Sequence, residues 1–187
     1  MDYNKAAQEL KDSIDQFFCE RKKDFDEALE LVIHAFQSGN KLMVFGNGGS
    51  ASQAQHFAAE LVGRFQKNRL PLPAIALTAD TSSLTALAND YSFEMVFHRQ
   101  VEALGRPGDL VFGLTTSGKS PNVISAFKKA REMHLNSIAL TGKGGVDLAP
   151  LVDVLLVVSS KDTPRIQEVH LFLLHFLAQE VENEFCK

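Results

Sequence analysis

The segment Lys41-Leu42-Met43-Val44-Phe45-Gly46-Asn47-Gly48-Gly49-Ser50 says most about the architecture of this chain. Its first half is a short run of large apolar side chains, which is typical of a buried strand. The glycines that follow allow a tight turn and a close approach of the backbone to a ligand. Ser50 is a suitable N-cap for a helix that begins there. The segment therefore predicts a strand, a turn and a helix in succession.

The same alternation of strand and helix continues to the end of the chain. Short apolar runs predict strands at 41–45, 73–77, 109–114, 136–140 and 153–158. Periodic segments predict helices at about 50–64, 81–88, 93–103, 121–133 and 165–184. Short strands that alternate with helices are typical of an α/β fold, with a parallel sheet covered by helices on both faces. Ligands of such sheets bind beyond the carboxyl ends of the strands, and every motif below falls there or on the following helix.

Residues 1–39 precede the first strand and carry apolar side chains at helical spacing. We expect two helices, one marked by Ala7 to Phe18 and one by Phe25 to Phe36, with Gly39 ending the second. Nothing on them suggests chemistry, so we assign them to packing and to contacts between subunits. The chain shows no linker, repeat or low-complexity stretch, and we expect one domain over residues 1–187.

Composition and charge exclude several classes of function. The net charge is −4 and no basic patch interleaved with aromatic residues is present, so nucleic acid is not expected as the main ligand. No apolar run reaches membrane-spanning length, and the chain opens on polar residues rather than an apolar signal sequence. Cys19 and Cys186 lie near opposite ends without metal-type spacing. We therefore expect a cytoplasmic protein that binds neither nucleic acid nor membrane.

His56 and Glu60 follow the glycine turn on the predicted helix 50–64. They are four residues apart, so their side chains share one face of that helix. An imidazole and a carboxylate one turn apart, next to a turn that allows close approach, predict a functional site. From this segment alone, two solvated polar residues beside a packing turn explain the pattern equally well.

Two polar residues of the predicted C-terminal helix extend this set. Gln167 and His175 are two steps of four residues apart, so they lie on nearly the same side of the helix. Alone, a histidine on so apolar a helix is more often a hydrogen-bonded core residue. With His56 and Glu60, however, they complete a set of two imidazoles, a carboxylate and an amide oxygen. Such a set can hold a divalent ion, zinc or a similar transition metal. His170 points well away from His175 and is assigned no role.

A loop rich in hydroxyl groups follows the predicted strand 109–114. Its sequence is Thr115-Thr116-Ser117-Gly118-Lys119-Ser120-Pro121, with Ser120 at the N-cap and Pro121 at the first position of the next helix. Such a helix start presents free N–H groups and the positive end of the helix dipole, which suits a phosphate. Since four hydroxyls are more than capping requires, we interpret the loop as a phosphate site rather than as a well-capped loop without a ligand.

Residues 113–120 also match the P-loop pattern G-x-x-x-x-G-K-[ST]. A P-loop nucleotide hydrolase needs an acidic residue at the end of another strand to help hold magnesium, and neither 136–140 nor 153–158 ends in one. We interpret the match as accidental, with Lys119 an additional charge near a phosphate, and keep nucleotide hydrolysis as a minor alternative. Asn89-Asp90, after the predicted helix 81–88, could cap that helix or contact sugar hydroxyls.

In this order and spacing, these residues resemble the sugar isomerase (SIS) domain family over essentially the whole chain, and within it the phosphoheptose isomerases. The segments that carry the resemblance are Gly46-Asn47-Gly48-Gly49-Ser50, His56-Phe57-Ala58-Ala59-Glu60-Leu61, Ala88-Asn89-Asp90, Thr116-Ser117-Gly118-Lys119-Ser120, Leu140-Thr141-Gly142 and Arg165-Ile166-Gln167-Glu168. The resemblance implies a five-stranded parallel sheet flanked by helices, a flavodoxin-like three-layer sandwich with an N-terminal helical extension. It also implies a homotetramer with active sites at subunit interfaces.

The resemblance further assigns roles to individual residues. It implies one divalent ion per subunit, zinc in the first place, on four ligands: His56, Glu60, Gln167 and His175. Glu60 and His175 match the acid–base pair. The residues that match the substrate site are Asn47, Gly48, Gly49, Asn89 and Asp90, with Thr115, Thr116, Ser117 and Ser120 around the phosphate. The chain departs from the family at Lys119, where asparagine is usual, and at Thr115, where serine is common.

The activity implied by the resemblance is the conversion of sedoheptulose 7-phosphate to D-glycero-D-manno-heptose 7-phosphate through an enediol. The family role is heptose supply for lipopolysaccharide core, capsule or another glycoconjugate. The first alternative is a non-catalytic SIS protein, similar to the relatives that bind the replication initiator protein. That group is expected to lack the full acid–base and metal set, which this chain keeps. An isomerase acting on a sugar phosphate of another chain length is the second alternative.

Overall fold

The computed structural model describes residues 2–186 and contains one sheet of five parallel strands. The strands are β1 (Leu42–Gly46), β2 (Ala74–Ala76), β3 (Leu110–Thr115), β4 (Asn136–Gly142) and β5 (Val154–Val158). Their order is β2-β1-β3-β4-β5, the flavodoxin-like order, and all four pairings are parallel. The predicted five-stranded parallel α/β fold is confirmed.

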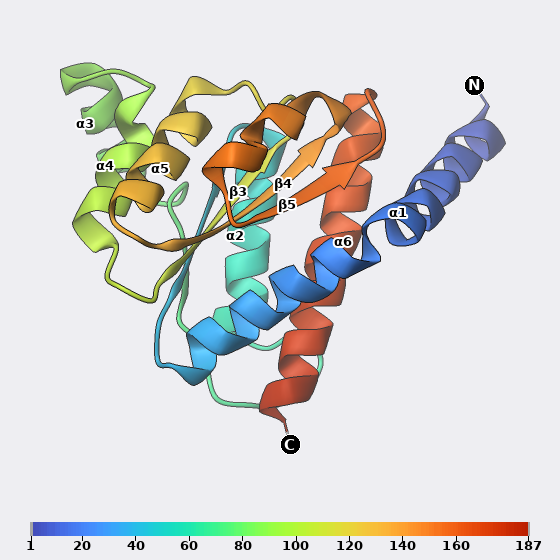
Figure 1. Ribbon diagram of the computed structural model, residues 1–187, viewed down its shortest axis with the longest axis horizontal. Coiled ribbons are helices and arrows are strands. Elements are labelled where there is room, and N and C mark those ends of the chain that lie inside the picture. Colours follow the sequence, from blue (N-terminus) through green and yellow to red (C-terminus); the bar gives the residue numbers. More distant parts are fainter. Residues whose placement is uncertain (1, 187) are drawn as a thin grey trace.

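Helices cover both faces of this sheet (Figure 1). The helices are α1 (Tyr3–Gln37), α2 (Gly49–Val62), α3 (Thr81–Asp90), α4 (Met95–Leu104), α5 (Pro121–Glu132), the 3₁₀ segment η1 (Lys143–Leu151) and α6 (Thr163–Phe185). From β1 onward, each predicted strand and helix is found, with its ends within two residues of the expected ones. The segment η1, with its two glycines and a proline, was not expected.

The core is divided by the sheet because alternate strand residues point to opposite faces. Leu42 and Val44 of β1 belong to one apolar cluster, which also contains the buried apolar residues of α1, α2 and α6. Met43 and Phe45 belong to a second cluster, which contains those of α4 and α5. The layers are therefore α1, α2 and α6 on one face and α3, α4 and α5 on the other, as Figure 1 shows.

The expectation of two helices before the first strand is wrong. A single helix, α1, runs across the polar stretch between Phe18 and Phe25 that suggested a break. This stretch contains neither glycine nor proline, and ion pairs between residues three and four positions apart, such as Lys22 with Asp26, support the helix across it. The gap in the apolar pattern marks a mostly exposed part of one helix and no helix end.

Ser50 is also not the N-cap of α2. Gly48 takes that position with a φ of +55°, and Ser50 lies inside the first turn, where it is buried. A φ in this left-handed region is readily adopted by glycine, so the helix begins earlier than a serine cap would allow. Ser120 and Pro121, in contrast, are the N-cap and first residue of α5, as predicted.

The order of the strands fixes where a ligand can bind. The chain leaves β1 toward one edge of the sheet and returns at β3 to build toward the other, so β1 and β3 flank the topological switch point. Gly46, the last residue of β1, pairs with Leu114, one residue before the end of β3. The glycine turn and the hydroxyl loop therefore lie next to each other. No helix among the described residues has the length and apolar character needed to cross a bilayer.

His170, which was assigned no role from its position in the sequence, is a core residue of α6. It is completely buried, whereas His175 on the same helix is partly exposed. Burial lowers the pKa of His170 from 6.5 to about 4, and the Thr141 backbone opposes this shift. The imidazole is therefore neutral in the folded protein at neutral pH.

This pKa predicts a loss of stability on mild acidification. Between pH 6.5 and pH 4 the unfolded chain binds the extra proton, so the contribution of neutral His170 is present above pH 6.5 and is lost as the pH falls. Between pH 7 and pH 5 the loss from this group is about 2 kcal/mol in the free energy of unfolding. Urea denaturation of the wild type and of His170→Leu at both pH values measures it. The variant is expected to lose about 2 kcal/mol less than the wild type, and equal losses would contradict the assignment.

Candidate active site

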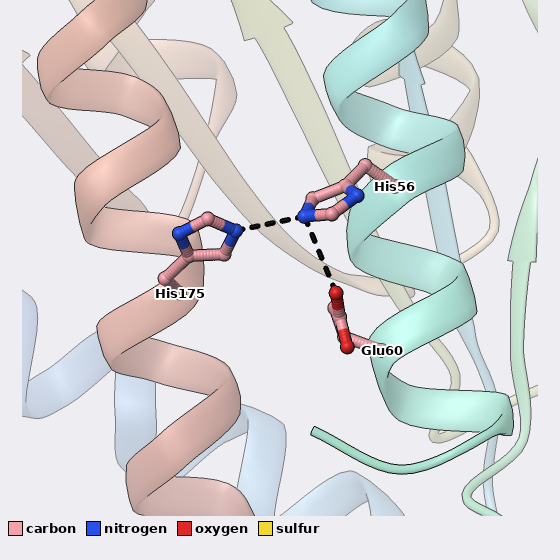
Figure 2. A group of neighbouring side chains, drawn as sticks. All are labelled: His56, Glu60 and His175. Carbon is pink, nitrogen blue, oxygen red and sulfur yellow. Dashed lines mark hydrogen bonds and ion pairs between the residues drawn. The ribbon is translucent and has the colours of Figure 1, made fainter. Parts of the chain in front are cut away.

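A cluster of two histidines and a glutamate stands on the surface between α2 and α6 (Figure 2). His56 and Glu60 come from α2, and His175 comes from α6. The His56 Nε2 atom lies 2.7 Å from Nε2 of His175 and 3.3 Å from Oε1 of Glu60. One possible ligand atom from each residue falls within 4.8 Å of the other two. Residues far apart in the chain thus form one polar site, as the sequence predicted.

The packing of α2 beside α6 brings these three side chains together. Both helices bury apolar residues in the same cluster on one face of the sheet, among them Ala58 and Leu61 of α2 and Leu174 of α6. Because the apolar residues of both helices point into this cluster, their polar residues lie along the outer edge that the two helices share. The side chain of His56 is 44% exposed there and that of Glu60 is 22% exposed, so a small ligand can reach them from solvent.

The charges of the cluster favour a neutral His175. Burial lowers its pKa, the neighbouring His56 lowers it further, and Glu60 acts in the opposite direction. The facing Nε2 atoms of His56 and His175 can share a hydrogen bond if one ring carries its proton on Nε2, or both lone pairs can bind one cation. Neutral imidazole is also the form that binds a metal. Two histidines and one glutamate are a common ligand set of catalytic zinc, which leaves a further position open. The residues fit a divalent metal.

Gln167, the fourth predicted metal ligand, lies at a different level of α6. It precedes His175 by eight residues, a rise of about 12 Å along the helix. Its side chain lies against Gly49, where a Cβ atom would come within 2.6 Å of the Gln167 Nε2 atom. A side chain at position 49 would therefore require the Gln167 amide to move. Three of the four predicted ligands are brought together, and a metal contact of Gln167 stays a prediction.

The glycine turn is joined to helix α5, which follows the hydroxyl loop, through a residue that sequence reasoning missed. Asn47, directly after β1, exchanges two hydrogen bonds with Asn122 of α5, each 2.8 Å long. Asn122 is only 2% exposed. A polar residue just inside a helix, right after Pro121, was a signal that could have suggested it. The paired amides hold the two loops of the switch point together.

The hydroxyl loop is ordered by its own side chains. Thr115 Oγ1 accepts a hydrogen bond from the N–H of Gly118 at 3.1 Å, and Ser117 Oγ accepts one from Lys119 N–H at 3.2 Å. Ser120 caps α5 without a side-chain capping bond. Thr116, Ser117 and Lys119 line one wall of a cavity of about 220 Å³, whose other lining residues are Gly144, Ser160, Lys161, Thr163 and Ile166. The loop thus presents hydroxyls and a lysine to an open space suited to an anion.

The P-loop match does not form a P-loop. Gly113, the first glycine of the pattern, lies inside β3 and pairs with both neighbouring strands, β1 and β4. It faces Phe127, whose ring would come within 2.4 Å of a Cβ atom at this position. The strand continues to Thr115, so the loop starts two residues later than the pattern requires. This arrangement supports the interpretation of the match as accidental.

Asn89 and Asp90 lie in the last turn of α3 rather than after it. The Asn89 amide donates to Asp90 Oδ1 at 2.8 Å, and both residues are exposed. Helix α3 belongs to the layer on the opposite face of the sheet from α2 and α6 (Figure 1). Within one chain, the fold does not bring this pair to the cluster of His56, Glu60 and His175.

Comparison with known proteins shows the family of this chain. A family model described as the SIS domain matches residues 3–142. A phosphoheptose isomerase of Aquifex aeolicus is 55% identical over 157 residues, 84% of this chain and 82% of that protein. One of Campylobacter jejuni is 52% identical over 164 residues, 88% of each. A solved phosphoheptose isomerase structure from Neisseria gonorrhoeae is 41% identical with a TM-score of 0.88, covering 98% of this chain and all of that one.

The chain belongs to the SIS domain family, whose model covers most of its length. The likeness extends beyond the fold, because half of the residues are shared with proteins of one activity over most of both chains. Within the family, the chain belongs to the phosphoheptose isomerases.

The packing of the hydroxyl loop generates a prediction for Gly118. Its φ is +67°, and a Cβ atom there would lie 2.2 Å from the Cα atom of Gly145. Gly39 has a similar φ of +74° with open space around it, so Gly39→Ala is a matched control. We expect Gly39→Ala to cost roughly 1 kcal/mol of unfolding free energy, from its backbone conformation alone. Gly118→Ala should cost clearly more, because two backbones must separate. Urea denaturation of both variants measures this, and equal costs would contradict the packing.

Proposed function

We propose that this protein interconverts sedoheptulose 7-phosphate and D-glycero-D-manno-heptose 7-phosphate, with Glu60 and His175 as its acid–base pair. The observation that carries the proposal is the cluster of His56, Glu60 and His175, built from segments 119 residues apart in a phosphoheptose isomerase chain. The alternative of a non-catalytic SIS protein is not favoured, because the relatives at about 50% identity are named as isomerases.

The reaction moves a carbonyl group from C2 to C1 of the sugar. A base removes a proton from C1, the electron pair of that C–H bond forms the C1–C2 double bond, and the C2 oxygen takes up a proton. The enediol then loses the proton of the C1 hydroxyl as a proton is returned to C2. Glu60, whose side chain is partly buried, is the proposed carrier of the carbon-bound proton. His175 is the proposed carrier of the oxygen-bound protons, because its lowered pKa lets the neutral ring accept and return a proton.

A divalent metal, zinc in the first place, is proposed as the cofactor, one per subunit. The proposed ligands are His56, Glu60, His175 and Gln167. Bound there, the ion supplies Lewis-acid polarisation of the sugar carbonyl or fixes the orientation of the acid–base pair. A carboxylate has two oxygens, so Glu60 can hold a metal with one and a proton with the other.

The remaining predicted residues are proposed to position the substrate. The hydroxyls of Thr115, Thr116, Ser117 and Ser120, with the N-terminus of α5, would hold the phosphate. Asn47, Gly48 and Gly49 would line the sugar. A phosphate anchored at one end of a flexible sugar restricts the other end to the acid–base pair, which is the main gain from such a loop.

Asn89 and Asp90 are proposed to act in a neighbouring subunit of a homotetramer. In one chain they lie on the other face of the sheet from the acid–base pair, and α3, which carries them, has no buried residue. Tyr91 and Phe93, which follow the pair, are 59% and 61% exposed, as expected of a surface that packs against another subunit. We further propose a cytoplasmic enzyme whose product supplies heptose to lipopolysaccharide or another glycoconjugate.

Substitution of the acid–base pair tests the proposed activity. Glu60→Gln and His175→Ala are each expected to lower kcat/KM for sedoheptulose 7-phosphate at least about 1,000-fold, because each removes a proton carrier. Formation of the aldose is the measurement, and thermal unfolding verifies that the variants are folded. His98→Ala is the control, since His98 contacts Ser125 on the other face of the sheet. Near-native turnover by either variant would contradict the assignment of that residue as a proton carrier.

Metal removal tests the cofactor. Incubation with a chelator should abolish isomerisation, and addition of Zn²⁺ should restore it. His56→Ala should weaken Zn²⁺ binding, measured by competition with a chromophoric chelator, by at least about 100-fold because a ligand is lost. His98→Ala should leave it unchanged. Full activity of a metal-free protein would rule out the proposed role of the ion.

A further inference from the structure

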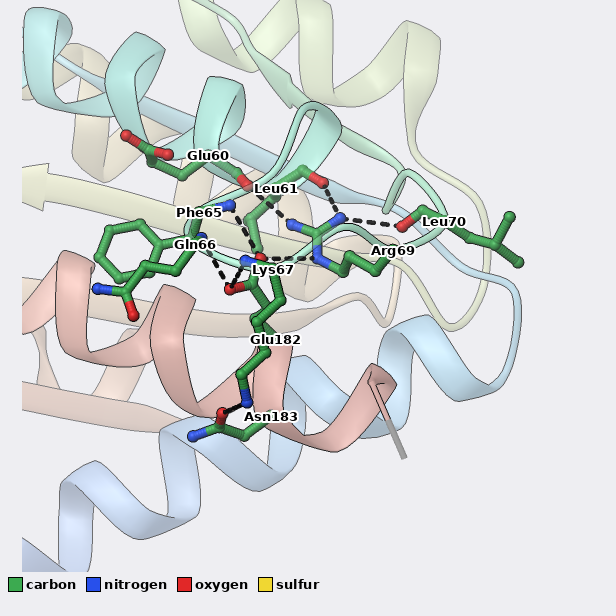
Figure 3. Close-up of polar contacts among 9 residues, drawn as sticks. All are labelled: Glu60, Leu61, Phe65, Gln66, Lys67, Arg69, Leu70, Glu182 and Asn183. Carbon is green, nitrogen blue, oxygen red and sulfur yellow. Dashed lines mark hydrogen bonds and ion pairs between the residues drawn. The ribbon is translucent and has the colours of Figure 1, made fainter.

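A second polar cluster joins α6 to the segment that follows α2, beyond the acid–base pair (Figure 3). Its centre is Glu182 of α6, a carboxylate that is almost fully buried. It accepts three backbone hydrogen bonds from the segment that follows α2: from Phe65 N–H at 2.9 Å, Gln66 N–H at 2.8 Å and Lys67 N–H at 2.7 Å. One side chain of α6 thus holds the whole turn by which the chain leaves α2.

Arg69 connects this carboxylate to the end of α2. Its Nε atom lies 3.5 Å from Oε1 of Glu182. Its Nη2 donates to the carbonyl oxygen of Glu60 at 2.8 Å, and its Nη1 donates to that of Leu61 at 2.8 Å. The last carbonyls of a helix have no partner within the helix, and a positive charge is favourable at that end. Arg69 therefore caps α2 at Glu60 itself.

The burial of this pair calls for an explanation other than stability. The side chains of Arg69 and Glu182 are 1% and 2% exposed. Burial raises the pKa of Glu182, but the three N–H groups and Arg69 outweigh it and lower the pKa, so the carboxylate stays ionised. A buried ion pair is a weak source of stability, because desolvation of both charges offsets their attraction. The pair instead fixes the relative orientation of the groups it joins, because a planar guanidinium forms its hydrogen bonds in set directions.

The positions of Arg69 and Glu182 in the fold show which part of the structure they hold in place. Glu182 follows His175 by seven residues, about 10 Å along α6, and Arg69 holds the backbone of Glu60 on α2. On the other side of the acid–base pair, Gln53 Nε2 of α2 donates to the carbonyl oxygen of Gln167 on α6 at 2.7 Å. Glu60 and His175 thus lie between two ties that join their helices.

We propose that Arg69 and Glu182 are positioning residues, which hold the end of α2 on α6 and so keep the Glu60 carboxylate in register with His175 and His56. The inference rests on the proposed function for its effect on turnover, whereas its effect on the metal cluster can be measured without substrate. Neither residue touches the reacting atoms.

The test uses two variants of the full chain and one matched control. Arg69→Lys keeps the charge beside Glu182 but loses the fork that reaches two carbonyls. Glu182→Gln keeps the shape and removes the charge. The control is Asp109→Asn, because Asp109 is equally buried, accepts the N–H groups of Lys41 and Arg106, and pairs with the Lys41 ammonium, all at the amino end of β3. The readouts are thermal unfolding, kcat and KM, and binding of Co²⁺ followed by its visible absorption.

If the pair positions Glu60, Arg69→Lys should weaken Co²⁺ binding about tenfold and change its absorption spectrum, because one ligand is displaced. In both variants kcat should fall about tenfold with KM changed less than about twofold, since the phosphate loop is untouched. Asp109→Asn should lose comparable stability with neither change. Arg69→Lys is the milder change and decides the matter if Glu182→Gln does not fold.

Two results would overturn the proposal. Co²⁺ affinity and kcat of Arg69→Lys equal to those of Asp109→Asn would leave the pair a purely structural role. An unchanged Co²⁺ spectrum with a lowered melting temperature would lead to the same conclusion. If the wild type binds Co²⁺ but does not turn over sedoheptulose 7-phosphate, the proposed function fails, and the Co²⁺ comparison still decides whether Arg69 and Glu182 position the cluster.

Discussion

The packing of α2 against α6 is the constraint on which the rest of this structure depends. Both helices lie on the same face of the parallel sheet and share one apolar core, so their polar residues meet along a single outer edge. That contact alone places His56 within 2.7 Å of His175 across 119 residues of chain. Were the two helices on opposite faces, the same residues would be separate surface groups with no common chemistry.

The loops of the site are rich in glycine and short side chains, yet contacts with other parts of the chain hold them in place. Two glycines and an asparagine of these loops contact residues from elsewhere in the chain: Gly49 lies against the Gln167 amide, Asn47 is hydrogen-bonded to Asn122, and Gly118 packs on the backbone of Gly145. Glu60 and His175 lie between two similar contacts that join α2 to α6, one at Gln53 and another at Glu182. Groups that must meet a substrate in a defined geometry gain most from such support, because order is established before binding.

Much of this could be read from periodicity and from turn residues. Every element from β1 onward except η1 was expected, because buried strands and amphipathic helices leave clear patterns. The N-terminal helix was divided wrongly, since a polar surface stretch resembles a helix end when only apolar spacing is considered. Asn122, Arg69 and Glu182 were missed for another reason. Their partners are backbone groups or side chains far along the chain, and no local pattern reports such a contact.

The sequence by itself determined the α/β class, the order of the elements, and the residues able to hold a metal or a phosphate, because these follow from local pattern and side-chain chemistry. Tertiary structure decided which of them meet. It joined His56, Glu60 and His175, set Gln167 against Gly49, and left Asn89 and Asp90 on the other face of the sheet. The physical reason is that helix spacing fixes the direction of a side chain around its own axis, whereas the face and depth at which two helices pack depend on the whole core.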